Sequence, residues 1–286
     1  MQVFILMLLA GVAAARGSVE SLGSYLHHSC GEGNISTPYK DYALNLNRLI
    51  FKQFYNESAK LFSNGTRGKS PNKVYDLFSC RGDIKPTACE SCVFQAAQEV
   101  LIRRCFKRKS AMIWFEGCFL RYADTSLVSK LDVKHEHHIW DSHKVPKPKW
   151  GAFNLAVSNM LRNLTAHATA AGNNHSFATG EVAVKGSPLK AYGLVQCTPS
   201  ISKSDCKKCL EKPVTSMLKS IQGRQGGRYL NPNCNLRYDV HPFASHSKPG
   251  KPGGPPRGKP GKPGGPPRGK PGKPGGPPRD DELGRA

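Results

Sequence analysis

Two stretches with the same cysteine spacing decide how this chain folds. They are Cys80-Arg-Gly-Asp-Ile-Lys-Pro-Thr-Ala-Cys89-Glu-Ser-Cys92 and Cys197-Thr-Pro-Ser-Ile-Ser-Lys-Ser-Asp-Cys206-Lys-Lys-Cys209, and both read C-x8-C-x2-C. Each is followed by one more cysteine, in the similar phrases Cys118-Phe-Leu-Arg-Tyr and Cys234-Asn-Leu-Arg-Tyr. One domain of about 100 residues, present twice, accounts for this repetition.

The apolar pattern around these motifs predicts an α+β fold in each copy. Residues 41–62 and the segment from Phe153 to Leu164 carry apolar side chains at helical spacing, and a second helix is predicted to carry each C-x2-C pair. Residues 74–80, 111–122, 177–185, 191–197 and 228–239 are rich in β-branched and aromatic residues, which favour strands. We therefore expect two helices packed on one antiparallel sheet, twice.

The ends of the chain differ from this duplicated body. The apolar run from Val3 to Val12 leads into Ala13-Ala14-Ala15, a pattern typical of a cleaved secretory signal. Residues 246–286 are rich in Lys, Pro and Gly, with an 11-residue repeat and no aromatic residue, which is typical of a disordered polycation. The predicted organisation is a signal peptide (1–15), domain 1 (25–126), a His-rich linker (127–145), domain 2 (146–245) and this tail (246–286).

Charge and cysteine usage indicate an extracellular protein. The chain has 42 basic and 20 acidic residues, so acidic cell-wall polysaccharide is a plausible partner for the tail, whereas no specific nucleic acid is expected. An even count of 10 cysteines favours disulfides over zinc in an oxidising compartment. We expect secretion to the apoplast, no membrane span, and N-glycosylation at five sequons: Asn34, Asn56, Asn64, Asn163 and Asn174.

Catalytic and metal-binding motifs do not stand out in the sequence. It contains no G-x-S-x-G and no H-E-x-x-H, so we predict a protein that is not an enzyme and uses no cofactor. His135-Glu136-His137-His138 could offer imidazole ligands to a metal, but a solvated linker without fixed ligand geometry is the preferred interpretation, and no metal is predicted.

The cysteine motifs, together with Tyr192-Gly-Leu-Val-Gln-Cys197 and Gly226-Gly-Arg-Tyr-Leu230, resemble the cysteine-rich repeat secretory proteins of land plants, which consist of ginkbilobin-type (salt-stress-response antifungal) domains. The resemblance implies two helices on a five-stranded antiparallel sheet in each copy. It also implies non-enzymatic recognition outside the cell, in defence or stress responses.

The resemblance implies a disulfide pairing as well. The pairs are Cys30–Cys105, Cys80–Cys89, Cys92–Cys118, Cys197–Cys206 and Cys209–Cys234. The second copy lacks one bridge, because Ser142 and Ile221 stand where its two cysteines would be.

Ginkbilobin-type domains bind mannose through an Asn, an Arg and a Glu, and the resemblance places these roles on specific residues here. The first copy has Gly31, Met112 and Ala123 at these positions and is expected to have no such site. The second copy has His143, Arg228 and Asp239, which could bind a sugar, although Arg228 could instead pair structurally with Asp239. The alternative functions are an extracellular protein–protein interaction module and a cationic antimicrobial or wall-binding protein that acts through its tail.

Overall fold

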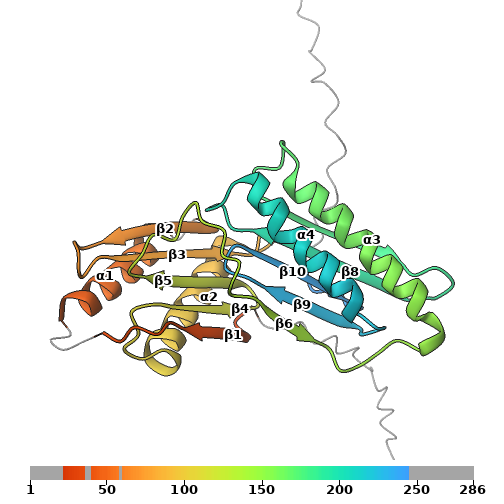
Figure 1. Cartoon of the computed structure of the whole chain (residues 1–286), viewed down its shortest axis with the longest axis horizontal. Coiled ribbons are helices and arrows are strands. Elements are labelled where there is room, and N and C mark those ends of the chain that lie inside the picture. The colour runs from red at the N-terminus through yellow and green to blue at the C-terminus, as the bar shows by residue number, and fades with distance from the viewer. Residues whose placement is uncertain (1–21, 36–39, 58–59, 245–286) are drawn as a thin grey trace, which may run out of the picture. The chain divides into compact units, whose positions relative to one another are not determined.

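The computed structural model describes residues 22–35, 40–57 and 60–244 (Figure 1). The predicted signal peptide (1–15) and the predicted tail (246–286) lie outside these residues.

The first copy is a five-stranded antiparallel sheet with two helices. Its elements in chain order are β1 (Tyr25–Cys30), α1 (Lys40–Glu57), β2 (Phe62–Arg67), β3 (Val74–Cys80), α2 (Pro86–Gln98), the π-helical turn η1 (Glu99–Arg104), β4 (Ala111–Phe115) and β5 (Cys118–Ala123). The strand order in the sheet is β1-β4-β5-β3-β2.

The second copy repeats this plan. Its elements are β6 (His137–Trp140), the short 3-10 helix η2 (Lys147–Lys149), α3 (Trp150–Thr169), β7 (Phe177–Ala183), β8 (Lys190–Cys197), α4 (Lys203–Ser220), β9 (Gly226–Leu230) and β10 (Cys234–Asp239). The strand order β6-β9-β10-β8-β7 matches that of the first sheet position by position. The predicted α+β fold of two helices on a five-stranded sheet is therefore confirmed for both copies.

One predicted boundary needs correction. Residues 127–145 are predicted to be a His-rich linker, but His137–Trp140 within them form strand β6, which pairs with β9 and is itself the edge of the second sheet. Ile139 lies opposite Arg228 in this pairing, and Asp141 continues it by donating its backbone N–H to the Gly226 carbonyl, 3.0 Å away. The second sheet thus begins inside the predicted linker.

Each pair of helices covers one face of its own sheet and encloses a separate core. Side chains at helical spacing supply the helix side of these cores, because residues three and four apart share one face. In the first copy they include Leu46, Leu49 and Ile50, and in the second Phe153, Val157, Leu161 and Leu164.

The structure contains the same five disulfides that the resemblance implies, and none of the ten cysteines is free. In the second copy, the position of the missing cysteine is occupied by Ile221, which is 0% exposed and belongs to the core. An apolar side chain therefore fills the space that a bridge occupies in the first copy.

Candidate functional site

The two copies bury the sheet faces that their helices leave uncovered. An apolar cluster joins Leu77, Met112, Trp114 and Phe119 of the first sheet to Leu230 of the second, with Leu127 of the connecting segment between them. Along β9, Tyr229 belongs to the helix-covered core and its neighbour Leu230 to this interface, as the alternation of side chains along a strand requires.

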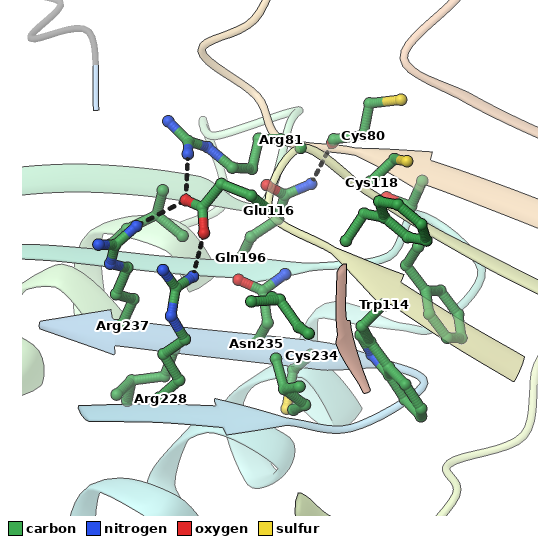
Figure 2. A pocket seen from close by; sticks show the side chains of 18 of the residues that line it. Cys80, Arg81, Trp114, Glu116, Cys118, Gln196, Arg228, Cys234, Asn235 and Arg237 are labelled. Carbon is green, nitrogen blue, oxygen red and sulfur yellow. Dashed lines mark hydrogen bonds and ion pairs between the residues drawn. The ribbon is translucent and has the colours of Figure 1, made fainter. Parts of the chain in front are cut away.

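A buried carboxylate lies at the centre of this interface (Figure 2). Glu116 is in the turn between β4 and β5, and its side chain is 1% exposed. Its Oε1 accepts from Arg81 Nη1 at 2.7 Å and from Arg237 Nη1 at 2.6 Å, and its Oε2 lies 2.5 Å from Arg228 Nη1. Two of these three guanidinium groups belong to the second copy, so the carboxylate joins the two domains.

Two further carboxylates balance the charge of this cluster. Asp83 accepts from Arg81 at 2.6 Å, and Asp239 accepts from Arg237 at 3.0 Å. Burial opposes the charge of Arg81, but hydrogen bonds and the charges of Asp83 and Glu116 raise its pKa above the ordinary arginine value. Three arginines thus face three carboxylates, so the cluster as a whole is balanced in formal charge.

The cavity beside this cluster is small. It has a volume of about 50 Å³ and is lined by Trp114, Glu116, Arg228 and Arg237 among others. Ligand pockets usually measure about 300–1,000 Å³. The Glu116 cluster is therefore a structural joint between the domains and has no room for a sugar ring.

The structure gives the predicted sugar-binding residues of the second copy separate ionic partners. Arg228 is 12% exposed and paired with Glu116, whereas Asp239 is paired with Arg237. His143 is 78% exposed, and its Nδ1 lies 2.8 Å from Asp141 Oδ1. The alternative prediction, an ion pair between Arg228 and Asp239, is replaced by an ion pair between Arg228 and Glu116. Arg228 lies opposite Arg237 on the neighbouring strand, and both side chains reach the Glu116 carboxylate.

The positions that the resemblance assigns to the first copy have structural roles. The strand pairing corrects one of them: Gly31 aligns with Asp141 and not with His143, because both donate a backbone N–H to the carbonyl of the residue before the equivalent pair Ala111 and Gly227. Met112 and Ala123 belong to the apolar interface. A Cβ on Gly31 would lie 1.9 Å from Ser110 Oγ, so glycine permits the close approach of these two segments.

The histidine-rich tract is ordered by contacts across the domains. His137 stacks on His27 of β1, with ring centroids 3.8 Å apart and an angle of 3° between the planes. Burial and the nearby imidazoles of His137 and His28 lower the pKa of His27 to about 4. His135 Nδ1 lies 2.9 Å from an Asp132 carboxylate oxygen. These contacts give the tract a role in the interface.

Metal-type donors gather at one point among the described residues. His28, Cys30 and Cys105 lie within reach of one another, but the two sulfurs form a disulfide and are not available as thiolates. The histidine tract does not form such a cluster within the described part of the chain.

A groove of about 660 Å³ lies between α3 and α4, the helices of the second domain. Arg162, Thr165 and Thr169 line it from α3, and Lys207, Glu211 and Thr215 from α4. Ala166, Ala170 and Val214 supply apolar surface. The α3 residues recur at spacings of three and four, so they form one stripe along that helix.

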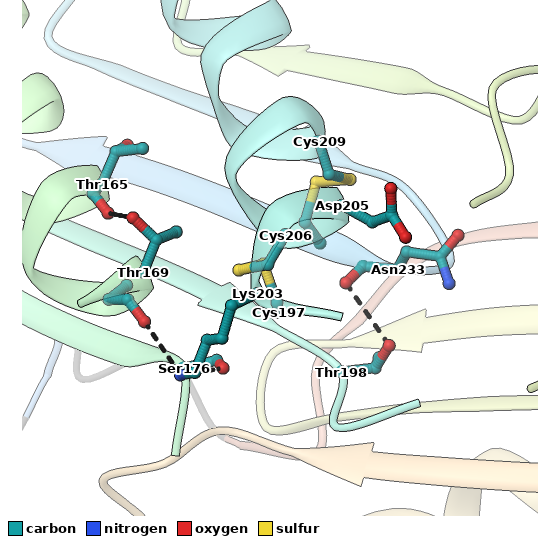
Figure 3. The surroundings of a disulfide bond; sticks show 12 residues. Thr165, Thr169, Ser176, Cys197, Thr198, Lys203, Asp205, Cys206, Cys209 and Asn233 are labelled. Atoms are coloured by element: carbon teal, nitrogen blue, oxygen red, sulfur yellow. Dashed lines mark hydrogen bonds between the residues drawn. A yellow bond between two sulfur atoms is a disulfide. The ribbon is translucent and has the colours of Figure 1, made fainter. Parts of the chain in front are cut away.

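Thr165 is the distinctive residue of this groove. It is 4% exposed, and its hydroxyl has no hydrogen-bond partner, although its backbone carbonyl accepts from Thr169 Oγ1 at 2.9 Å (Figure 3). A buried hydroxyl without a partner is uncommon in proteins and destabilising unless something satisfies it. The hydroxyl oxygen is itself buried, so a polar ligand in the groove would supply that partner after a movement of the neighbouring side chains.

The two helices that flank the groove are tied together at one end. The Ser202 hydroxyl caps α4 by accepting from the Asp205 backbone N–H. The Lys203 ammonium donates to Ser176 Oγ at 2.7 Å and to the Ala168 carbonyl at 3.4 Å, which ties the start of α4 to the end of α3 (Figure 3). No sequence motif indicated this groove, although the stripe of Arg162, Thr165 and Thr169 follows the helical periodicity of α3.

Four predicted glycosylation sites lie on exposed surface. Asn34, Asn64, Asn163 and Asn174 have exposed side chains, which is compatible with the predicted modification. The side chain of Asn56 lies outside the described residues. None of the described helices is both long and apolar enough to cross a membrane.

Two five-stranded sheets packed face to face, with five disulfides and helices on the outer sides, define a tandem cysteine-rich repeat fold. The family described as salt stress response/antifungal matches residues 29–125 and 141–241, and this chain belongs to it.

Similar proteins agree with this assignment. The chain is 33% identical over 221 residues to cysteine-rich repeat secretory protein 38 of Arabidopsis thaliana, covering 77% of this chain and 86% of that one. It is 34% identical over 218 residues to an antimicrobial ginkbilobin-2-like protein of Castanea crenata, covering 76% and 88%. The fold is similar to that of the tandem DUF26 ectodomain of the Arabidopsis thaliana cysteine-rich receptor-like protein PDLP5, with a TM-score of 0.64 and 24% identity over 76% of this chain and 100% of that one.

Proposed function

We propose that this chain is a secreted, non-enzymatic recognition protein that binds a carbohydrate ligand of the mannose type in the groove between α3 and α4. Secretion to the extracellular space, the apoplast of a plant, is supported by the signal-like residues 1–15, by five sequons and by ten paired cysteines. The name of the relative from Arabidopsis thaliana, a secretory protein, points the same way.

The observation that carries the proposal is the unpartnered hydroxyl of Thr165 in a groove of ligand size. The groove volume of about 660 Å³ lies within the usual range of ligand pockets. Its lining combines hydroxyls with Arg162, Lys207 and Glu211, and charged groups form strong hydrogen bonds with pairs of sugar hydroxyls. Lys207 and Glu211 lie 3.8 Å apart on the surface, so both are accessible to a ligand.

The residues His143, Arg228 and Asp239 are the second candidate location for a sugar. A ligand there would have to compete with Glu116 for Arg228, because that guanidinium is held 2.5 Å from a buried carboxylate. In the α3–α4 groove Arg162, Lys207 and Glu211 are exposed, so a ligand meets charged groups there without breaking a buried ion pair, and this difference favours the groove.

A titration of the full chain with mannosides and other neutral glycans, preceded by a glycan array, tests both locations. Arg162→Ala should weaken binding by about 10–100-fold, since it removes a charged hydrogen-bond donor. Thr165→Val should weaken binding by about 3–10-fold without destabilising the fold, because the hydroxyl it removes has no partner inside the protein.

A matched control is needed because Thr165 also belongs to the Asn163 sequon. Asn163→Gln removes the sequon and keeps the hydroxyl, so it should bind as the wild type does. Loss of binding in Arg228→Ala, with the groove variants unaffected, would move the site to the sheet end. If no neutral glycan binds, the carbohydrate proposal is wrong and a protein ligand takes its place.

A further inference from the structure

The turn that follows α2 in the first domain exposes two large apolar side chains among basic ones. Ile102, in η1, is 67% exposed, and Phe106, just after it, is 61% exposed. The residues next to them are cationic: Arg103, Arg104, Lys107, Arg108 and Lys109. We call Glu99–Lys109 the basic apolar turn.

A disulfide and backbone hydrogen bonds fix the turn and keep the side chains of Ile102 and Phe106 at the surface. Cys105, between Ile102 and Phe106, is 2% exposed and bonded to Cys30 of β1. The Lys107 carbonyl accepts from the backbone N–H of Ile35 at 2.8 Å, and the Lys109 N–H donates to the Gly33 carbonyl at 2.8 Å. The turn therefore cannot easily fold its apolar side chains inward.

Positive charge dominates the basic apolar turn. Its single carboxylate, Glu99, lies 2.7 Å from Arg103 and 3.3 Å from Arg104, so four of its five cationic charges remain in excess. The Lys107 ammonium lies 5.1 Å from the centre of the Phe106 ring, which places charge and apolar surface side by side. Glu32 adds one further carboxylate residue nearby, since its carbonyl accepts from Arg108.

The second domain shows that the fold does not require this surface. Gln222 occupies the position equivalent to Phe106, because Ile221 occupies that of Cys105. The residue after the tip has a similar backbone in both copies, since Lys107 has a φ of 62° and its counterpart Gly223 a φ of 75°, although Gln222 has a φ of 43° and Phe106 has no positive φ. A similar turn is therefore built in the second domain with a polar side chain at its tip.

We propose that the basic apolar turn docks on anionic phospholipid membranes. Exposed apolar side chains within a ring of cations match such a surface, because the side chains enter the headgroup region while Lys and Arg meet the lipid phosphates. This activity is independent of the proposed carbohydrate groove, which lies between the helices of the other domain.

Co-sedimentation of the full glycosylated chain with lipid vesicles tests the proposal, and Asn34→Gln, which removes the sequon opposite Arg108, shows how far a sugar there weakens the binding. The vesicles contain phosphatidylcholine with about 30% phosphatidylglycerol, in about 150 mM salt. The variant Ile102→Ser/Phe106→Ser should bind about tenfold more weakly than the wild type, since two exposed apolar side chains no longer enter the interface. Phe106→Gln, which installs the residue of the second domain, should lose part of the binding.

A matched control replaces apolar side chains of equal exposure elsewhere. Val133→Ser/Leu155→Ser removes side chains that are 65% and 61% exposed, and it should bind vesicles as the wild type does. Equal binding by the wild type and Ile102→Ser/Phe106→Ser would overturn the proposal, because the attraction would then come from charge elsewhere, residues 246–286 included. An equal loss in the control pair, or equal binding to pure phosphatidylcholine, would also overturn it.

Discussion

Replacing Glu116 by Gln removes one negative charge from a site where three guanidinium groups converge, and the side chain keeps its shape. The carboxylate is 1% exposed and lies 2.5–2.7 Å from nitrogen atoms of Arg81, Arg228 and Arg237. Arg81 and Arg237 keep Asp83 and Asp239, so the variant leaves an excess of one buried positive charge. Breaking a buried ion pair from one side costs about 3–5 kcal/mol, and we expect the free energy of unfolding to fall by that amount.

Glu99→Gln is the matched control. Glu99 also pairs with two arginines, Arg103 and Arg104, but these are 74% and 38% exposed. Water and salt screen such a pair, so this substitution should cost less than about 1 kcal/mol. The contrast between the two variants isolates the effect of burial.

Urea unfolding at neutral pH with the disulfides intact measures both variants. Adding Arg228→Met to Glu116→Gln removes the excess charge and should restore part of the lost stability, which a double-mutant cycle would report as coupling. A loss below about 1 kcal/mol in Glu116→Gln would refute the argument that the Glu116 cluster joins the domains by buried charge.

Three further measurements test individual side chains. Burial raises the pKa of Asp76 to about 7, so the folded protein holds a proton that the unfolded chain releases near pH 3.8. Stability is therefore lost as pH rises from about 3.8 to 7. In urea unfolding at pH 7, Asp76→Asn should be more stable than the wild type by about 2–4 kcal/mol, and equal stability would contradict this. Burial and the imidazoles of His137 and His28 lower the pKa of His27 to about 4. Its contribution to folding stability is therefore present above pH 6.5 and is lost as pH falls toward 4. After allowance for solvent screening, the stability of the wild type relative to His27→Gln should drop by about 1 kcal/mol between pH 7 and 4, and a constant difference would argue against this. Ile221→Ala should lower the unfolding free energy by about 2–5 kcal/mol, because the side chain is 0% exposed in the second core, and a thermal shift no larger than that of Leu155→Ala would show that the space collapses.

The sequence predicted the helices and central strands because their residues carry periodic apolar patterns. Of the four edge strands, β7 was predicted within 177–185, whereas β1, β2 and β6 were missed. β1 reads Tyr-Leu-His-His-Ser-Cys and β6 reads His-His-Ile-Trp, so neither has a clear alternation. Such segments become strands through pairing with β4 and β9, which lie far away in the sequence. The predicted strands 111–122 and 228–239 are each two strands, separated by turns that include Gly117 and Asn231.

The functional residues were harder to foresee, because their partners are distant in the sequence. Glu116 follows an apolar strand and precedes Gly117, as an ordinary hairpin turn residue would, yet its partner Arg237 is 121 residues away. Arg228 lies in the motif Gly226-Gly-Arg-Tyr-Leu230, and the resemblance assigns it a role in sugar binding. Its contact with Glu116 depends on the packing of the two sheets, which the sequence does not show. In contrast, the stripe that contains Thr165 is present in the helical periodicity of α3, so that part of the site was accessible to sequence reasoning.

The two copies supply opposite net charges to the buried cluster at their interface. Domain 1 supplies Arg81, Asp83 and Glu116 to the buried cluster, an excess of one negative charge, and domain 2 supplies Arg228, Arg237 and Asp239, an excess of one positive charge. Either domain alone would expose the apolar interface cluster and leave one charge of the joint uncompensated. An isolated domain of this chain is therefore expected to be less stable than the tandem. Because each copy uses its open sheet face to bind the other, the surfaces left for ligands are the helices and turns, where the α3–α4 groove and the basic apolar turn lie.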